Sequence, residues 1–156
     1  MKIYIATALE RAGDHNLLRD ALRREGHELT YDWTTHGSVK GQGVDRVRSV
    51  ARAEAEGART ADAVVALLPG GRGTHVEIGI AIGANVPVIL VGPRELFGDG
   101  AETCAFYHLG EGGVVLDYTK GWAEYVAGLI QPLIAMRDVY SLTSRLDVSP
   151  ISEVSE

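Results

Sequence analysis

A glycine-rich segment followed by an isolated carboxylate is the part of the sequence best suited to chemistry. Residues 69–73 read Pro-Gly-Gly-Arg-Gly, and the spacing predicts a helix that starts at Thr74. Glycines let the backbone pass close to a ligand, and the free N–H groups of a helix start favour an anion, so this segment with Arg72 indicates an anion-binding loop. Glu77 is the only formally charged side chain between Thr74 and Pro93. A carboxylate among apolar neighbours beside such a loop indicates a functional group.

The same spacing also has a purely structural interpretation. Thr74-x-x-Glu77 fits a capping box, in which a Glu at the third helical position bonds back to the N–H of the cap residue. Spacing alone leaves both interpretations of Glu77 open.

The elements that position these residues alternate between strand and helix. Apolar β-rich runs predict strands and helically spaced apolar residues predict helices. We expect strands at Lys2–Thr7, Glu28–Asp32, Ala63–Leu68, Val86–Val91 and Gly113–Leu116, and helices from Asp14 to Gly26 and at Asp45–Arg59, Thr74–Ala84 and Trp122–Met136. This order predicts an α/β fold with a doubly wound, Rossmann- or flavodoxin-like parallel sheet of five strands and helices on both faces. Ligands bind such sheets beyond the C-terminal ends of the strands.

The composition is that of one globular domain. The chain has 156 residues, of which 46% are hydrophobic and 23% charged. We expect a single α/β domain over residues 1–136, and we interpret the serine-containing residues 137–156 as a polar tail or an arm that lies on a partner.

Charge, cysteine content, apolar stretches and histidine spacing argue against several classes of protein and site. The formal net charge of −6 argues against binding a nucleic-acid polymer. The single cysteine, Cys104, excludes an internal disulfide and suggests a cytoplasmic protein. No apolar stretch is long enough to cross a membrane. His36, His75 and His108 lack the spacing of metal ligands, so no metal or other cofactor is expected.

Two stretches resemble a known family. Residues 61–79, which end in G-T-H-V-E-I-G, and the opening strand Lys2–Ala6 with its tyrosine resemble the nucleoside 2-deoxyribosyltransferase family. That family includes 2′-deoxynucleoside 5′-phosphate N-hydrolases and pyrimidine-nucleotide N-glycosidases. The similarity covers most of residues 1–92.

The resemblance implies a mechanism and assigns roles. Glu77 would be the nucleophile that attacks C1′ of the sugar and forms a glycosyl-enzyme ester, which another base or water then releases. Tyr4 would orient the nucleophile. The family's second acid lies eight positions before Asp62, which is Glu54, with Glu56 nearby. Tyr4 at the edge of the core, and both glutamates on a solvated helix face, are the structural alternatives.

Further residues are expected at the substrate. They are Ala6, Arg11, Trp33, Glu56, Gly71, Arg72, Gly73 and Thr74. Gly71 stands where some transferases of the family carry an additional acid, and with Arg72 it favours a nucleotide phosphate instead. Trp33 can stack on a base or cover the core. Arg11 can contact phosphate or form an exposed salt bridge.

These observations predict an enzyme that cleaves the N-glycosidic bond of (deoxy)nucleosides or their 5′-monophosphates. Transfer of the sugar is the reaction that names the family. Hydrolysis of a nucleoside 5′-monophosphate and a non-catalytic nucleotide-sensing module are the alternatives. We expect a homo-oligomer, because the family's sites are completed by a neighbouring subunit. The segment P-G-G-R-G-T-x-x-E also resembles cytokinin-nucleotide phosphoribohydrolases, which break the same kind of bond, but their upstream glycine-rich segment is absent here.

Overall fold

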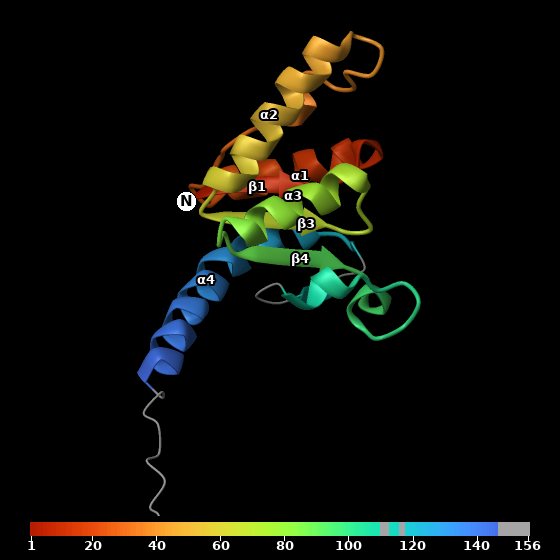
Figure 1. Ribbon diagram of the computed structural model, residues 1–156. Helices are drawn as coiled ribbons and strands as arrows, with labels where there is room; N and C mark the ends of the chain where they lie inside the picture. Colours follow the sequence, from red (N-terminus) through yellow and green to blue (C-terminus); the bar gives the residue numbers. More distant parts are fainter. Residues whose placement is uncertain (110–112, 116–117, 147–156) are drawn as a thin grey trace, which may run out of the picture.

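The fold is a parallel sheet with helices on both faces, seen in a computed structural model that describes residues 1–109, 113–115 and 118–146, with side chains for 1–109 and 118–136 (Figure 1). The strands are β1 (Lys2–Ala6), β2 (Glu28–Leu29), β3 (Ala63–Leu67), β4 (Val88–Gly92) and β5 (Gly113–Val115). The main helices are α1 (Ala12–Arg24), α2 (Val44–Thr60), α3 (Arg72–Gly83) and α4 (Trp122–Leu146), with 3-10 turns at Leu9–Arg11, Trp33–Thr35, Arg94–Phe97 and Ala105–Leu109.

The strand order places a crevice between β1 and β3. The sheet runs β2-β1-β3-β4-β5 with every pair parallel. After β1 the chain moves outward to β2 and then returns to the other side of β1, so the connections that follow β1 and β3 diverge. Ligands bind at such a switch point, beyond the C-terminal ends of the strands. The predicted α/β class with a parallel sheet is confirmed.

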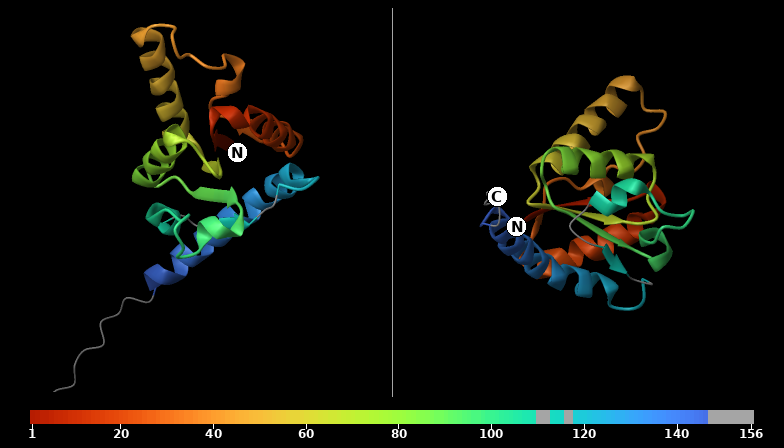
Figure 2. Two further views of the ribbon diagram at one scale, coloured as in Figure 1. Left: turned by 90° about the vertical axis from the view of Figure 1, so that its right-hand side faces the viewer. Right: turned by 60° about the horizontal axis from the view of Figure 1, so that its bottom comes forward.

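Strand alternation decides which side chains lie under which helices. Ile3 and Ile5 of β1 point toward α1 and α4, whereas Tyr4 points to the face covered by α2 and α3. Figure 2 shows α3 on one side of the sheet and α4 on the other. The buried residues of the first layer include Leu18, Leu22, Val126 and Ile130, and those of the second include Ala58, Ile78 and Ala81. Tyr4 is therefore buried beneath the two helices that carry Glu54 and Glu77.

Several element boundaries differ from those predicted. β2 ends at Leu29 rather than Asp32, because the Asp32 carboxylate accepts the Thr34 N–H and starts a 3-10 turn there. α3 begins at Arg72, two residues before Thr74.

The last helix is longer than expected. α4 continues from the predicted end at residue 136 to Leu146, a stretch that contains neither glycine nor proline. Its C-terminal part extends beyond the sheet in Figure 1. The predicted domain boundary at 136/137 thus falls within a continuous helix, and the interpretation of 137–156 as a tail or arm stays a prediction. Leu116 and residues 147–156 lie outside the described residues.

No helix in the described part of the chain has both the length and the apolar character needed to cross a membrane.

Two adjacent leucines of α1 test the packing of the first layer. Leu18 is fully buried, whereas its neighbour Leu17 is 56% exposed. Leu18→Ala is expected to lower the free energy of unfolding by about 2–5 kcal/mol, because it removes core contacts and leaves a cavity. The matched change Leu17→Ala is expected to cost less than about 0.5 kcal/mol. Urea denaturation of both variants measures the difference, and equal losses would contradict the layer assignment.

Candidate active site

A buried hydrogen bond joins the two residues expected to act together. The Tyr4 hydroxyl donates to Glu77 Oε1 at 2.7 Å. Tyr4 comes from the middle of β1 and is fully buried, and Glu77 comes from α3 and is 8% exposed. The hydroxyl holds one carboxylate oxygen in place. The other oxygen, Oε2, is also buried and has no hydrogen-bond partner among the described residues.

Burial dominates the acid–base properties of this pair. The pKa of Glu77 is raised to about 7. Burial is the largest cause, the hydrogen bond from Tyr4 opposes the rise, and the nearby negative charge of Glu54 adds to it. The pKa of Tyr4 is raised by burial and by the Glu77 carboxylate, so its hydroxyl remains a donor. The result is a carboxylate with one constrained oxygen and one oxygen that lacks solvation.

The capping interpretation of Glu77 is wrong. α3 is capped by Gly71 and begins at Arg72, so Thr74 lies inside the first turn. The Thr74 hydroxyl accepts the N–H of Gly71 at 3.1 Å. Glu77 lies in the second turn and bonds to Tyr4 of another element. The helix start is stabilised without Glu77, which leaves its carboxylate to serve another purpose.

Glu77 lies in a pocket at the C-terminal edge of the sheet. The cavity has a volume of about 560 Å³, within the range of small-molecule sites. Seven predicted site residues line it: Trp33, Glu54, Gly71, Arg72, Gly73, Thr74 and Glu77. The other five lining residues were not named among the predicted substrate residues: Thr7, Ala8, Leu9, Glu10 and Lys40. The structure thus brings together segments that follow β1, β2 and β3.

Glu54 enters the pocket from α2 and is half-buried. Burial raises the pKa of its carboxyl group, and the nearby His36 lowers it in part. Two hydrogen bonds hold the His36 ring in place. Its Nε2 lies 2.8 Å from the Tyr31 hydroxyl, and its Nδ1 lies 2.8 Å from the Gly37 carbonyl. A carbonyl only accepts, so Nδ1 of His36 carries a proton. A carboxyl with a raised pKa beside Glu77 is suited to donating a proton.

His75 links the glycine loop to Tyr107 through two hydrogen bonds. Its Nδ1 lies 2.8 Å from the Gly71 carbonyl and its Nε2 lies 2.8 Å from the Tyr107 hydroxyl. The carbonyl can only accept, so Nδ1 donates, and in the neutral ring Nε2 accepts from Tyr107. Both polar groups of the Gly71 backbone are therefore paired, since its N–H goes to Thr74. The N–H groups of the first helical turn have no partner within the helix and face the same edge of the sheet.

Trp33 borders the pocket but is 5% exposed. The edge of its ring meets His15, with 5.0 Å between the ring centroids. His15 is fully buried, and burial lowers its pKa, which favours the neutral ring. Trp33 both covers the core and offers part of an aromatic surface to the pocket, which accommodates both of its predicted roles.

Three predicted substrate residues do not line the pocket. The Arg11 guanidinium donates to Asp14 and to the Leu68 carbonyl and stacks 4.2 Å from the centre of the Tyr118 ring. Ala6 is fully buried in β1. Glu56 is exposed on α2 and pairs with Arg59, three residues on. Arg11 thus stabilises the strand ends, and Glu56 follows the solvated-face alternative.

Lys40 is the unpredicted residue with the clearest chemical consequence. It lies in the polar segment between Trp33 and α2 and adds a second cation to a pocket already lined by Arg72. The position of that loop after the second strand was a signal for this site. The choice of Lys40 within it depends on how the chain folds back, which no local pattern shows.

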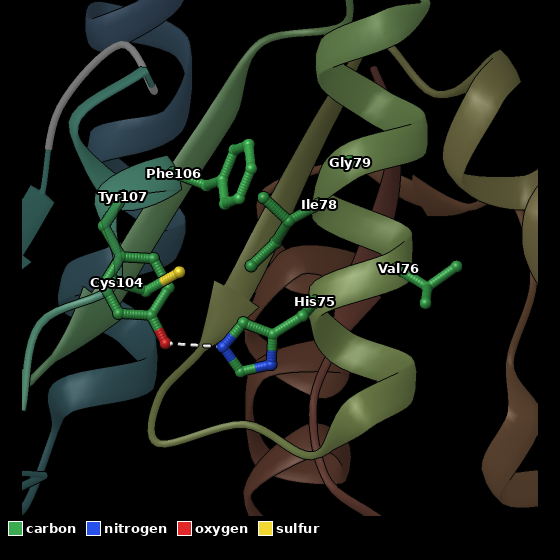
Figure 3. A pocket seen from close by; sticks show the side chains of 7 residues that line it. All are labelled: His75, Val76, Ile78, Gly79, Cys104, Phe106 and Tyr107. Carbon is green, nitrogen blue, oxygen red and sulfur yellow. Dashed lines mark hydrogen bonds between the residues drawn. The ribbon is translucent and has the colours of Figure 1, made fainter.

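A second, apolar pocket lies on the other side of α3 (Figure 3). Its volume is about 360 Å³, and it is lined by His75, Val76, Ile78, Gly79, Cys104, Phe106 and Tyr107. Glu77 is two positions from His75, about 200° around the helix, which explains why the two side chains serve different pockets. In Figure 3 the His75 ring reaches toward the Tyr107 hydroxyl.

Comparison with known proteins identifies the family. A sequence profile described as nucleoside 2-deoxyribosyltransferase matches residues 3–104, which contain Tyr4, Glu54 and Glu77. The chain belongs to this family. The resemblance carried by residues 61–79 is thereby confirmed, and with it a place among enzymes that act on nucleosides or nucleotides. No curated protein matches the sequence.

Solved structures share the fold. The chain is 15% identical to the CMP N-glycosidase BcmB of Clostridium botulinum, with a TM-score of 0.55 over 81% of this chain and 98% of that one. It is 16% identical to a 2-deoxyribosyltransferase of the psychrotolerant bacterium Bacillus psychrosaccharolyticus, with a TM-score of 0.57 over 79% and 96%. The solution structure of BlsM gives 18% identity and a TM-score of 0.56 over 97% and 96%.

Metal ligands are not gathered anywhere in the described residues, where no group of three or more His, Cys, Asp or Glu side chains is placed to hold an ion.

The raised pKa of Glu77 predicts a pH-dependent stability. Its pKa in the fold, about 7, is above the ordinary value of 4.5, so the folded state binds this proton more tightly than the unfolded state. This contribution is complete below about pH 4.5 and is lost as the pH rises through 7. Glu77→Gln cannot titrate, so between pH 4.5 and pH 8 it is expected to gain up to about 3 kcal/mol of unfolding free energy relative to the parent.

Urea unfolding of the parent and of Glu77→Gln at both pH values measures this gain. Glu56→Gln, a change at an exposed glutamate, is the matched control and is expected to show no such pH-dependent difference. If Glu77→Gln kept the same difference from the parent at both pH values, the carboxyl group would titrate normally.

Proposed function

We propose that this protein cleaves the N-glycosidic bond of (deoxy)nucleosides or their 5′-monophosphates through a covalent bond between the sugar and Glu77. The observation that carries the proposal is the geometry of that carboxylate in the pocket: Tyr4 fixes Oε1, and Oε2 is buried with no hydrogen-bond partner in the part of the chain that the structure describes. An oxygen that has lost its water and gained no donor is a stronger nucleophile than a solvated one. Membership of the family supports the same reaction class.

The reaction proceeds in two steps. Glu77 Oε2 attacks C1′ as the bond from C1′ to the base nitrogen breaks, and the base leaves with that electron pair. The protonated Glu54 carboxyl donates its proton to the departing base. In the second step water, or a nitrogen of another base, attacks C1′ and releases the Glu77 carboxylate, while Glu54 takes the proton of the incoming nucleophile. Tyr4 acts through Glu77, so it is a positioning residue.

The surroundings of the two carboxyl groups differ. Burial raises the pKa of Glu54, which therefore retains its proton to higher pH. Burial also raises the pKa of Glu77, to about 7, but the hydrogen bond from Tyr4 opposes this rise and favours the charged form above that pH. A pair of carboxyl groups with different surroundings is the usual arrangement when one acts as acid and the other as nucleophile.

Substitution of Glu77 tests the covalent step. Glu77→Gln keeps the size of the side chain but lacks the charge that attacks C1′, so base release is expected to fall by more than about 10⁴-fold, beyond what acid–base assistance alone supplies. The assay is chromatography of free base from a panel of nucleosides and 5′-monophosphates, with and without a second base as acceptor. The acceptor arm separates transfer from hydrolysis.

Trapping identifies the nucleophile directly. A 2-fluoro-2-deoxy sugar with a good leaving group is expected to add one sugar mass to the peptide that carries Glu77. A label on Glu54, or full activity of Glu77→Gln, would overturn the assignment. Binding of nucleotides without base release from any member of the panel would instead favour the nucleotide-sensing alternative.

Hydrolysis or transfer with a 5′-monophosphate is favoured by the cations of the pocket. Arg72 and Lys40 line it together with the N-terminal turn of α3. Arginine and helix-start N–H groups form charge-assisted hydrogen bonds with phosphate oxygens. These groups support a nucleotide rather than a nucleoside as the preferred substrate.

Arg72→Ala tests the phosphate assignment. A lost charge-assisted bond is worth about 1.5–3 kcal/mol, so KM for the 5′-monophosphate is expected to rise more than about tenfold while KM for the matching nucleoside changes little. Arg48→Ala, which removes an exposed arginine paired with Asp45 on α2, is the control. Equal effects of Arg72→Ala on both substrates would remove the phosphate from this end of the pocket.

A further inference from the structure

Helix α2 rests on strand β1 at a residue without a side chain. Gly57 is buried, and a Cβ atom added there would lie 3.0 Å from Cδ2 and 3.1 Å from Cε2 of the Tyr4 ring. It would also lie 3.0 Å from Cβ of Tyr31. These distances are tighter than nine in ten contacts that real Cβ atoms make. The backbone of α2 therefore lies close against the Tyr4 ring.

The close approach explains why a glycine occupies this position. Gly57 lies inside α2, three residues before its end, where glycine is among the least favourable residues. Its backbone does not have the positive φ that would require glycine. The contact with the two tyrosines is what a larger residue would disturb.

Neither neighbour can move aside easily. Tyr4 is fully buried and its hydroxyl is bound to Glu77. The Tyr31 atom in contact is Cβ, which is fixed to the backbone. The Thr30 hydroxyl also donates to the Gly57 carbonyl at 2.9 Å and ties the helix to the segment after β2. An added methyl group would have to displace α2 itself.

We propose that Gly57 is a positioning residue that sets the distance between Glu54 and the Tyr4–Glu77 pair. Glu54 lies one helical turn before Gly57 on the same side of α2, so a shift of the helix at 57 moves the Glu54 carboxyl by a similar amount. The proposal rests on the proposed function, because it assigns to this contact the alignment of acid and nucleophile.

Gly57→Ala tests the proposal, with Gly79→Ala as the matched control. Gly79 is also inside a helix, but a Cβ added there meets nothing within 4 Å. Gly57→Ala is expected to lower kcat by about 10–100-fold, because small misplacements of catalytic groups are costly. KM is expected to stay within about twofold, since the glycine loop and the cations are untouched. Gly79→Ala is expected to keep both constants.

A double-mutant cycle shows whether the loss passes through Glu54. In the Glu54→Gln background, Gly57→Ala is expected to lower kcat by less than threefold, because the group it misplaces no longer acts. A full additional loss in that background, or a rise in KM without a fall in kcat, would overturn the proposal.

Two further measurements keep the proposal testable if Gly57→Ala folds poorly or if no substrate is turned over. Thr30→Val removes the hydrogen bond to the Gly57 carbonyl and is expected to lower kcat as well. Thr30→Ser keeps the hydroxyl and is expected to keep the activity. Crystal structures of Gly57→Ala and Gly79→Ala report the Glu54–Glu77 separation without any assay. An unchanged separation in Gly57→Ala would overturn the positioning role, while an inactive parent enzyme with a shifted Glu54 would count against the proposed function alone.

Discussion

The hydrogen bond between Tyr4 and Glu77 is the interaction on which the site depends. Burying a carboxylate in the apolar layer between α3 and the sheet costs folding free energy. The hydrogen bond from the tyrosine hydroxyl offsets part of that cost by replacing the water lost from one of the two oxygens. The bond requires β1 and α3 to be neighbours, which follows from the pairing of β1 with β3, the strand that leads into α3. The parallel sheet is thus the frame that brings residues 73 positions apart within 2.7 Å.

The glycine loop is constrained from several sides. Thr74 binds the Gly71 N–H, His75 binds the Gly71 carbonyl, and Arg11 holds the Leu68 carbonyl just before the loop. A loop of this composition would be mobile in isolation. These contacts leave the N-terminal turn of α3 preorganised, which reduces the entropy lost when an anion binds.

The sequence predicted that Glu77 and Glu54 lie in the site, but it predicted less well which cations line the pocket. Glu77 was identifiable because an isolated carboxylate in an apolar helix stands out, and the family spacing located Glu54. The capping alternative failed because the helix starts two residues earlier, a boundary that depends on how the loop is held. Arg11 and Lys40 are both cations in segments that follow strands of the sheet, Arg11 after β1 and Lys40 after β2. Only the fold directs one guanidinium to the Leu68 carbonyl and the lysine to the pocket.

The two ends of α2 differ in how they are packed. Its buried residues are Val50, Gly57 and Ala58, and the first six residues of the helix are exposed. The preceding loop contains three glycines at positive φ and carries Lys40. Buried contacts therefore hold α2 from Val50 onward, the part that carries Glu54, whereas its first six residues and Lys40 are exposed. A substrate that is bulkier toward Lys40 would meet an exposed glycine-containing loop, whereas one that is bulkier toward Glu54 would meet a packed helix.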